Sequence, residues 1–371
     1  MIQYIIVILD RNSTSFCFYE NKMYYEYNSE LMPVKLVQDI IDYSIRNNIS
    51  INFLYGNHKL PDEYEKLVDS SQHIKIIPLK LKKYYNDAIF VINYDDMGLI
   101  SELENNSNNN IILRLEKKDL NKLMEIFSLL LGKFKRLNLS LLGIETYSEQ
   151  DFQEYSLYLK EIETMAEEEY KKGNMIELNF ISDRLGLMNM NNCDAGIKHL
   201  TFAPNGKFYL CPAFYYDNSD NYVGDLENGF SIKNENLLYL KYSSVCSNCD
   251  SYHCKRCIYM NKLTTYEINV PSHQQCVISH LERNTTKTLL ENLKPYEDLF
   301  QNFVDIPKID HLDPFDLVKD IIDQRNDSPS AEILSELLSK PLENMTNKEL
   351  FKRIYLIDKN ILVKLKNYKY L

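Results

Sequence analysis

Residues 193–211 read CDAGIKHLTFAPNGKFYLC, residues 246–257 read CSNCDSYHCKRC, and Cys276 follows after 18 further residues. Seven of the eight cysteines of the 371-residue chain lie in this stretch. Four thiols within twelve residues are too closely spaced for unstrained disulfides, but they suit wrapping around a metal ion or a cluster. The sequence therefore predicts metal binding between Cys193 and Cys276.

The first half of this stretch predicts a β-hairpin. The Pro-Asn-Gly sequence at 204–206 favours a tight turn, because asparagine and glycine tolerate a positive φ. Short strands over 200–203 and 207–210 would flank the turn. Cys211 would then lie at the end of the return strand, where its thiol can face a metal.

The residues leave two kinds of metal site open. Paired Cys-x2-Cys units suit a tetrahedral zinc ion as well as an iron–sulfur cluster. Seven thiols exceed the four ligands of one site, so we expect two sites, one of them short of a fourth thiol. A role as buried apolar groups alone is the least favoured interpretation. The predicted metal ligands are Cys193, Cys211, Cys246, Cys249, Cys254, Cys257 and Cys276.

Composition excludes several classes of protein. The chain is 44% hydrophobic and 26% charged, which is ordinary for a globular protein. Its net charge of −11 argues against a nucleic-acid partner, because such surfaces are basic. No apolar run approaches the ~20 residues of a membrane span, and no signal peptide begins the chain. Clustered cysteines without a secretion signal predict a cytoplasmic location.

The first 172 residues predict an α/β fold. Nearly continuous apolar runs indicate strands, and apolar residues at helical spacing indicate helices between them. The expected strands cover 2–10, 49–55, 74–79, 88–94, 111–115 and 137–144. The expected helices begin at Pro33 or cover 61–68, 118–133 and 148–172. This alternation implies a parallel sheet, and six units are fewer than the eight of a closed barrel.

The cysteine pattern resembles the SPASM domain of radical S-adenosylmethionine (radical SAM) enzymes that modify peptides and proteins. The resemblance is carried by CDAG at 193–196, APNGKFYLCP at 203–212 and VGDL at 223–226. It implies two auxiliary [4Fe–4S] clusters, the first with one open iron. The first would be held by Cys193, Cys211 and Cys257, and the second by Cys246, Cys249, Cys254 and Cys276. The family spaces its inner cysteines by five and three residues, against four and two here, which keeps zinc as the alternative.

The same resemblance implies a three-part organisation. A partial (β/α)6 radical-SAM-like barrel is expected over 1–190, and a SPASM-like domain over 191–284. A small α-helical C-terminal region is expected over 285–371, because helix-like segments alternate there with prolines. The segments lie near 277–293, 314–324, 330–340 and 347–369.

Two motifs of active radical SAM enzymes are missing. Where the family has Cys-x3-Cys-x2-Cys, residues 13–20 read STSFCFYE, so only Cys17 remains. We interpret Cys17 as a small buried hydrophobe in a hairpin with 22–27, and expect no cluster there. Where the family has Gly-Gly-Glu, the chain has Gly-Asn-His at 56–58, and the carboxylate for the ammonium group of S-adenosylmethionine is gone. We therefore expect that the protein does not use this cofactor.

Four further residues are candidates for a functional site. His58 could be a ligand or a base, but a surface histidine is the favoured interpretation. His253 could bind the metal beside Cys254, but we expect it to face solvent. Asp183 and Arg184 are expected to form an ion pair at a domain interface rather than a catalytic pair. The sequence assigns no catalytic residue.

Three functions are compatible with these features. The chain resembles maturases of peptides with Cys-x-x-x repeats, which implies a role in maturing a ribosomally synthesised, cysteine-containing precursor peptide. Its thiolate would bind the open iron. Alternatively, the protein presents the peptide to a genuine radical SAM enzyme, or it is a zinc-stabilised interaction domain. Little sequence precedes the first strand, so no leader-binding module is expected before it.

Overall fold

A computed structural model of the chain describes residues 2–22, 30–105, 108–190, 193–243, 245–299, 305–313 and 316. The chain forms two compact units, Met1–Lys308 and Ile309–Leu371. All elements below belong to the first unit. Apart from Asp316, the helices expected near 314–324, 330–340 and 347–369 lie outside the described residues.

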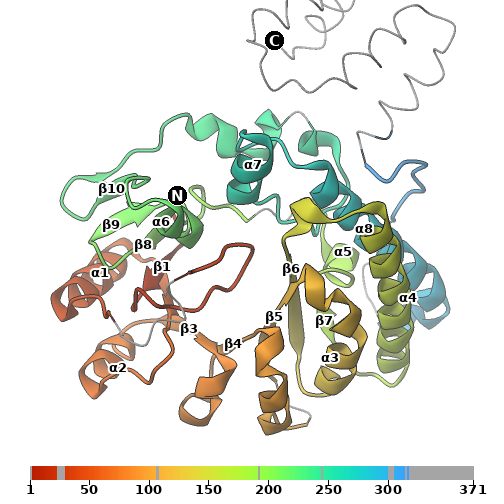
Figure 1. Cartoon of the computed structure of the whole chain (residues 1–371), viewed down its shortest axis with the longest axis horizontal. Helices are drawn as coiled ribbons and strands as arrows, with labels where there is room; N and C mark the ends of the chain where they lie inside the picture. Colours follow the sequence, from red (N-terminus) through yellow and green to blue (C-terminus); the bar gives the residue numbers. More distant parts are fainter. Residues whose placement is uncertain are drawn as a thin grey trace, which may run out of the picture. The chain divides into compact units, whose positions relative to one another are not determined.

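The first unit is built on one eleven-stranded sheet with the order β11-β10-β9-β8-β1-β2-β3-β4-β5-β6-β7 (Figure 1). From β8 through β1 to β7 every neighbouring pair is parallel, and β8 to β11 form antiparallel pairs. The parallel strands are β1 (Tyr4–Ile8), β2 (Ser50–Leu54), β3 (His73–Pro78), β4 (Ile89–Ile92), β5 (Asn110–Glu116), β6 (Arg136–Leu142), β7 (Glu177–Leu178) and β8 (His199–Phe202). The antiparallel edge consists of β9 (Lys207–Tyr209), β10 (Gly224–Asp225) and β11 (Gly229–Phe230). The predicted α/β class and parallel sheet are confirmed.

Helices connect most of the strands, close to the predicted ranges. The α-helices are α1 (Val34–Asn47), α2 (Asp62–Val68), α3 (Leu123–Leu130), α4 (Glu149–Lys171), α5 (Asp183–Gly186), α6 (Pro212–Asp217), α7 (Ile258–Thr265) and α8 (His273–Leu293). Ser148 and Asp151 form the predicted capping box of α4. The expected helix over 118–133 begins as the 3₁₀ helix Lys117–Lys122 and becomes α-helical only at Leu123.

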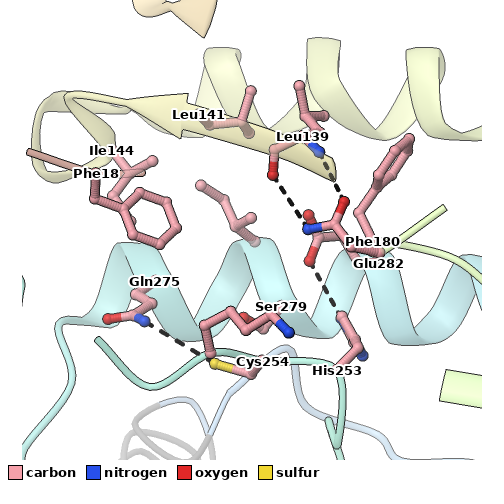
Figure 2. A pocket seen from close by; sticks show the side chains of 13 residues that line it. Phe18, Leu139, Leu141, Ile144, Phe180, His253, Cys254, Gln275, Ser279 and Glu282 are labelled. Atoms are coloured by element: carbon pink, nitrogen blue, oxygen red, sulfur yellow. Dashed lines mark hydrogen bonds and ion pairs between the residues drawn. The ribbon is translucent and has the colours of Figure 1, made fainter. Parts of the chain in front are cut away.

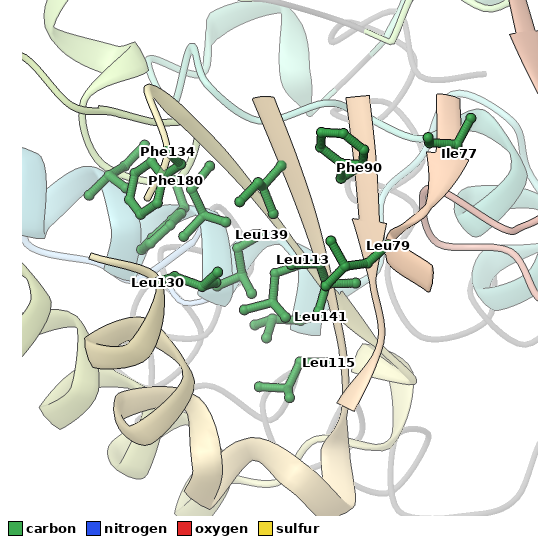
Figure 3. Packing of buried hydrophobic residues seen from close by; sticks show 14 of the residues in the cluster. Ile77, Leu79, Phe90, Leu113, Leu115, Leu130, Phe134, Leu139, Leu141 and Phe180 are labelled. Atoms are coloured by element: carbon green, nitrogen blue, oxygen red, sulfur yellow. The ribbon is translucent and has the colours of Figure 1, made fainter. Parts of the chain in front are cut away.

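Both faces of the sheet are buried. On β1, Ile5 and Val7 pack in a large cluster with the helices, whereas Ile6 and Ile8 belong to a second cluster. We call these the outer and the inner face, and side chains alternate between them along each strand. Double burial explains why the strands read as continuous apolar runs. Outer-face residues drawn in Figure 3 include Leu113, Leu115, Leu139 and Leu141.

The cysteine-rich region continues this sheet instead of standing apart from it. The predicted hairpin is present as β8 and β9, with Gly206 at a φ of +74° in the turn. In addition, β8 pairs with β1 in parallel, from Tyr4 opposite His199 to Val7 opposite Phe202. The sequence did not predict this pairing. Within the described residues, no helix combines the length and apolarity that a membrane crossing requires.

Candidate functional site

The loop after β1 carries Cys17 and is fixed by an arginine of β5. The buried Arg114 donates to the carbonyl oxygens of Cys17 at 3.2 Å and Tyr19 at 2.8 Å. Its guanidinium also donates to Asn93 Oδ1 at 2.9 Å and to the Glu20 carboxylate. The planar, permanently charged guanidinium suits such a set of acceptors. The loop after β1 therefore folds around the positively charged guanidinium group of Arg114.

The same loop is tied to the cysteine-rich region. The hydroxyls of Ser13 and Tyr216 share a hydrogen bond of 2.6 Å, and the Tyr216 ring stacks on Tyr19 at 5.6 Å between centroids. Because Tyr216 lies in α6, these contacts join segments about 200 residues apart. Residues 12–21 contain no strand, and most of the predicted hairpin partner, 22–27, lies outside the described residues.

Gly56 and His58 follow β2 at the same edge of the sheet. A Cβ atom at Gly56 would lie 2.5 Å from Oδ2 of Asp10, so the close approach of the two loops requires glycine. Asp10 in turn accepts from the backbone amides of Asn12 at 2.9 Å and Glu30 at 3.2 Å. His58 is exposed, which confirms its interpretation as a surface histidine.

Four cysteines from four separate segments lie close enough for their charges to act on one another, three of them at the inner face of the sheet and Cys257 in the large cluster. This first thiol group consists of Cys17, Cys193, Cys211 and Cys257. Cys17 and Cys193 pack against the apolar cluster that contains the buried Cys211. The four thiols form six pairs, and in each pair the charge of one thiolate raises the pKa of the other thiol. Burial is the larger cause, and it raises the pKa of Cys17 to about 12.

Helix starts and backbone contacts position the members of this group. Cys211 is the N-cap of α6, and Cys257 is the N-cap of α7, where its sulfur accepts from the amide of Met260 at 3.5 Å. The backbone amide of Cys193 donates to the Lys255 carbonyl at 2.7 Å. Since the raised pKa values keep the thiols protonated at neutral pH, metal binding here must release protons.

The second thiol group lies in the segment before α7 and at the start of α8. It consists of Cys246, Cys249, Cys254 and Cys276. Burial, and then the charges of Cys246 and Cys249, raise the pKa of Cys254 to about 12. The amide of Gln275 points at the Cys254 sulfur at 4.0 Å, and His280 Nε2 contacts the Cys249 sulfur at 3.5 Å. Helix α8, which carries Cys276, therefore contacts Cys254 and Cys249 through Gln275 and His280.

Buried arginines hold the segment of the second thiol group. Arg283 of α8 is fully buried and donates to both carboxylate oxygens of Asp250, at 2.7 and 2.6 Å. Arg184 donates to the Asp250 carbonyl at 2.7 Å. Burial opposes ionisation of Asp250, but the hydrogen bonds from Arg283 hold its pKa below the ordinary value. Asp183 does not share this site, because it pairs with Arg136 at 2.6 Å. The expected Asp183–Arg184 pair is thus replaced by two separate ion pairs.

His253 is buried, so the expectation that it faces solvent is wrong. Helix α8 covers it, and the Nε2 atom of His253 lies 3.2 Å from Glu282 Oε2 (Figure 2). The other carboxylate oxygen of Glu282 accepts a hydrogen bond from Tyr155 at 2.8 Å. A cavity of about 50 Å³ adjoins this pair and Cys254, with Phe18 on its opposite side. Glu282 and Tyr155 therefore orient the histidine beside the second thiol group.

The cysteines of the described residues do not form a compact group of three thiols. Among the described residues, no three cysteine sulfurs all lie within 4.8 Å of one another. Zinc–sulfur bonds of about 2.3 Å in a tetrahedron place the sulfurs about 3.8 Å apart. A cluster of four irons is larger than one ion and separates its ligands further. The thiols of the region suit an iron–sulfur cluster as well as a zinc ion.

A larger cavity, of about 900 Å³, opens at the carboxyl ends of β5 and β6. It is lined by 18–22 of the loop after β1, by the two strand ends, and by parts of α6 and α7. Three lysines and four acidic residues share its walls with tyrosine and leucine side chains. Phe18 and Tyr259 stand one and two residues from Cys17 and Cys257. Residues close in sequence to Cys17 and Cys257 thus line this cavity.

Several of these residues were not predicted. Arg114 had a signal, because it interrupts the apolar run Ile-Ile-Leu-Arg-Leu of β5. Arg283 and Glu282 had none, because charged residues on a helix are usually exposed. Tyr216 could not be linked to Ser13, since only the fold brings the two together.

Neither a protein-family model nor any curated protein matches the sequence. Among solved structures, native anSMEcpe with bound AdoMet and the Cp18Cys peptide is similar, with a TM-score of 0.51 and 13% identity over 80% of this chain and 98% of that chain. Hexahistidine-tagged anSMEcpe with bound AdoMet gives 0.52 and 13%, over 81% of this chain and 96% of that chain. At such identity the likeness concerns the fold alone. It shows that this chain shares the overall fold of anSMEcpe.

Proposed function

We propose that this protein acts in the maturation of a ribosomally synthesised peptide, carries two [4Fe–4S] clusters in its cysteine-rich region, and does not cleave S-adenosylmethionine. The observation that carries this proposal is the cavity of about 900 Å³ at the carboxyl ends of β5 and β6, whose lining residues Phe18 and Tyr259 are close in sequence to Cys17 and Cys257. Ligands of open α/β sheets bind at this edge. The similar anSMEcpe structure holds AdoMet and a peptide.

The walls of the cavity suit an extended peptide. Apolar and aromatic side chains would contact alternate residues of the peptide, while charges of both signs would bind its polar groups. Lys117 and Lys118 lie on one wall, and Glu20 and Asp217 on others. A peptide of mixed composition fits this surface better than a single small charged molecule.

The loop after β1 argues against cleavage of S-adenosylmethionine. In the implied family, three thiolates in this loop hold the cluster that binds the cofactor. Here Arg114 fixes the loop through Tyr19, Glu20 and the carbonyl of Cys17. After β2, Gly56 is packed on Asp10 and no carboxylate takes the place of the family's glutamate. Neither the cluster nor the cofactor's ammonium group finds its usual partners.

The two thiol groups are the proposed cluster ligands. An iron–sulfur cluster supplies electron transfer, or ligand binding at an iron that no protein group occupies. The protein's own residues release the thiol protons, exclude water by burial and fix the segment of the second group through Arg283 and Asp250. We propose that residues 191–284 form the metal-binding region and that the protein works in a reducing, cytoplasmic compartment. Zinc remains the rival metal.

A second candidate function is presentation of the peptide to a genuine radical SAM enzyme. The loop after β1 favours this function, because Arg114 occupies it in place of the cluster that binds the cofactor in the implied family. The large cavity for a peptide is nevertheless present. A turnover assay with and without such a partner enzyme distinguishes presentation from independent catalysis.

The proposal is tested with reduced, anaerobically purified protein in two assays. Incubation with S-adenosylmethionine should give no 5′-deoxyadenosine above the dithionite control. A cysteine-containing precursor peptide should bind, and Lys117→Glu together with Lys118→Glu should weaken binding of an acidic peptide more than that of a basic one. Formation of 5′-deoxyadenosine, or equal binding by the charge-reversed protein, would contradict the proposal.

A further inference from the structure

We propose that Cys17 is the fourth protein ligand of the cluster held by Cys193, Cys211 and Cys257, so that this cluster has no open iron. The inference deepens the proposed function and rests on its iron–sulfur clusters. It differs from the expectation drawn from the sequence, in which Cys17 is a buried hydrophobe and the first cluster is open.

The first observation is the convergence of four segments on one place. Cys17 comes from the loop after β1, Cys193 from the segment before β8, and Cys211 from the end of the β8–β9 hairpin. Cys17 and Cys193 pack on the same inner-face apolar cluster as Cys211. Cys257 is buried in the large cluster, and its neighbour Ile258 belongs to the inner-face one. The mutual effects of all four thiols on one another's pKa agree with this proximity.

The second observation is that the loop is built to hold Cys17 in place. Arg114 binds the carbonyl of Cys17 itself and that of Tyr19 two residues later. Farther along, the amide of Asn21 donates to Ser15 Oγ at 2.8 Å. A side chain kept only as a small apolar group would not need a fixed backbone. These hydrogen bonds hold the thiol of Cys17 in place even when no cluster is bound.

The third observation concerns ligand count and spacing. A [4Fe–4S] cluster takes one ligand at each iron, and three cysteines leave one iron without a protein ligand. Cys17 supplies the missing thiolate after losing its proton, and the iron–thiolate bond compensates for the burial of the charge. Among the described residues, no three cysteine sulfurs lie within 4.8 Å of one another, a spacing compatible with a cluster between them.

This arrangement has a consequence for the peptide. Phe18, Tyr19 and Glu20, which directly follow Cys17, line the 900 Å³ cavity, so the cluster would lie behind the cavity wall. With all irons ligated, a thiolate of the peptide cannot bind it. Cys17 would then link the cluster to the cavity wall through the loop that it begins, and the cluster would not coordinate the peptide.

The test compares the full chain purified anaerobically as wild type, Cys17→Ala and Ser13→Ala. Ser13→Ala is the matched control, because it removes the Tyr216 hydrogen bond from the same loop but no thiol. Iron and sulfide are counted, and iron loss to a chelator is timed. Cys17→Ala should release iron from one of two clusters about tenfold faster than either other protein. In wild type, Cys17 should be alkylated by iodoacetamide about tenfold faster after chelation than before, because a bound thiolate is a poor nucleophile.

The outcomes separate the two proposals. Wild-type protein without iron would overturn the proposed function. Iron-containing wild type in which Cys17 is alkylated equally fast before and after chelation, or a Cys17→Ala protein that keeps iron as well as Ser13→Ala, would overturn the role of Cys17 alone. The alkylation experiment uses no variant, so it decides the question even if Cys17→Ala folds poorly.

Discussion

The two thiol groups are assembled in different ways. Three members of the second group lie within nine residues, between Cys246 and Cys254, and α8 supplies the fourth. The members of the first group are spread from Cys17 to Cys257 and meet only because β8 pairs with β1 and the loops fold over the inner face. A local site can be recognised from its spacing, whereas a site made of distant segments requires the fold. The first group also depends on the loop that lines the large cavity.

The largest expected effect separates the two groups by metal content. Cys211→Ala should remove one cluster and Cys254→Ala the other, so that each loses about half of the iron, because each takes a ligand from a different group. Iron and sulfide analysis with electron paramagnetic resonance should show complementary remaining spectra. Loss of all iron in both variants would contradict two independent sites.

Arg283→Ala should be the most destabilising change at the second group. It leaves the Asp250 carboxylate without its two short hydrogen bonds, which costs about 3 kcal/mol of the free energy of unfolding. Urea unfolding measures the cost, and metal analysis should show iron lost mainly from the second cluster. Lys287→Ala on the same helix is the control and should leave the unfolding midpoint unchanged. Equal effects of both variants would contradict the anchoring role of Arg283.

Arg114→Leu should act on the first group. It leaves the carbonyls of Cys17 and Tyr19 without their donor, at a cost of about 2 kcal/mol, because Glu20 is partly exposed and can be hydrated. The loop should loosen, and iron should leave the first cluster faster while the second is unaffected. Urea unfolding and timed chelation measure these two effects. A variant that loses iron from the second cluster instead would contradict this assignment.

The smallest expected effect is acid sensitivity near the first group. His199 stacks on Tyr4 at 4.8 Å, its Nδ1 is buried without a partner, and burial lowers its pKa to about 4. Between pH 6.5 and about 4 the unfolded chain therefore binds a proton that the folded chain does not, so stability falls as pH decreases through this window. From pH 6.5 to 5 the loss should be on the order of 1 kcal/mol.

The matched variant for this effect is His199→Phe, which keeps a ring against Tyr4. Urea unfolding at pH 7 and pH 5 should show a smaller decrease in the free energy of unfolding for the variant than for wild type. An equal decrease in both proteins would assign the acid sensitivity to other groups.

Most of the fold could be predicted from the sequence. Apolar runs located β1 to β6, because strands buried on both faces leave an unmistakable pattern. The Pro-Asn-Gly turn located the β8–β9 hairpin. The pairing of β8 with β1 could not be predicted, since each strand is compatible with several neighbours. The 3₁₀ helices Leu79–Tyr84 and Tyr94–Glu102, which follow β3 and β4, could not be predicted either, because their sequences have no apolar periodicity.

The candidate site was predictable only where its residues are close in sequence. The spacing of the inner cysteines indicated a metal site, but the place of Cys17 beside Cys193 and Cys211 depends on long-range packing. The burial of His253 could not be foreseen, because the carboxylate that pairs with it comes from α8. Arg114 was visible as a charge in an apolar strand, but its acceptors belong to a loop about 95 residues away.

Metal analysis of the anaerobically purified full chain tests the central claim most directly. Iron and sulfide quantification combined with Mössbauer spectroscopy should give about eight irons and eight sulfides per chain, in two [4Fe–4S] clusters whose irons all carry four sulfur ligands. An iron site with a non-sulfur ligand would contradict the closure of the first cluster by Cys17. Stoichiometric zinc with negligible iron would contradict the iron–sulfur account as a whole.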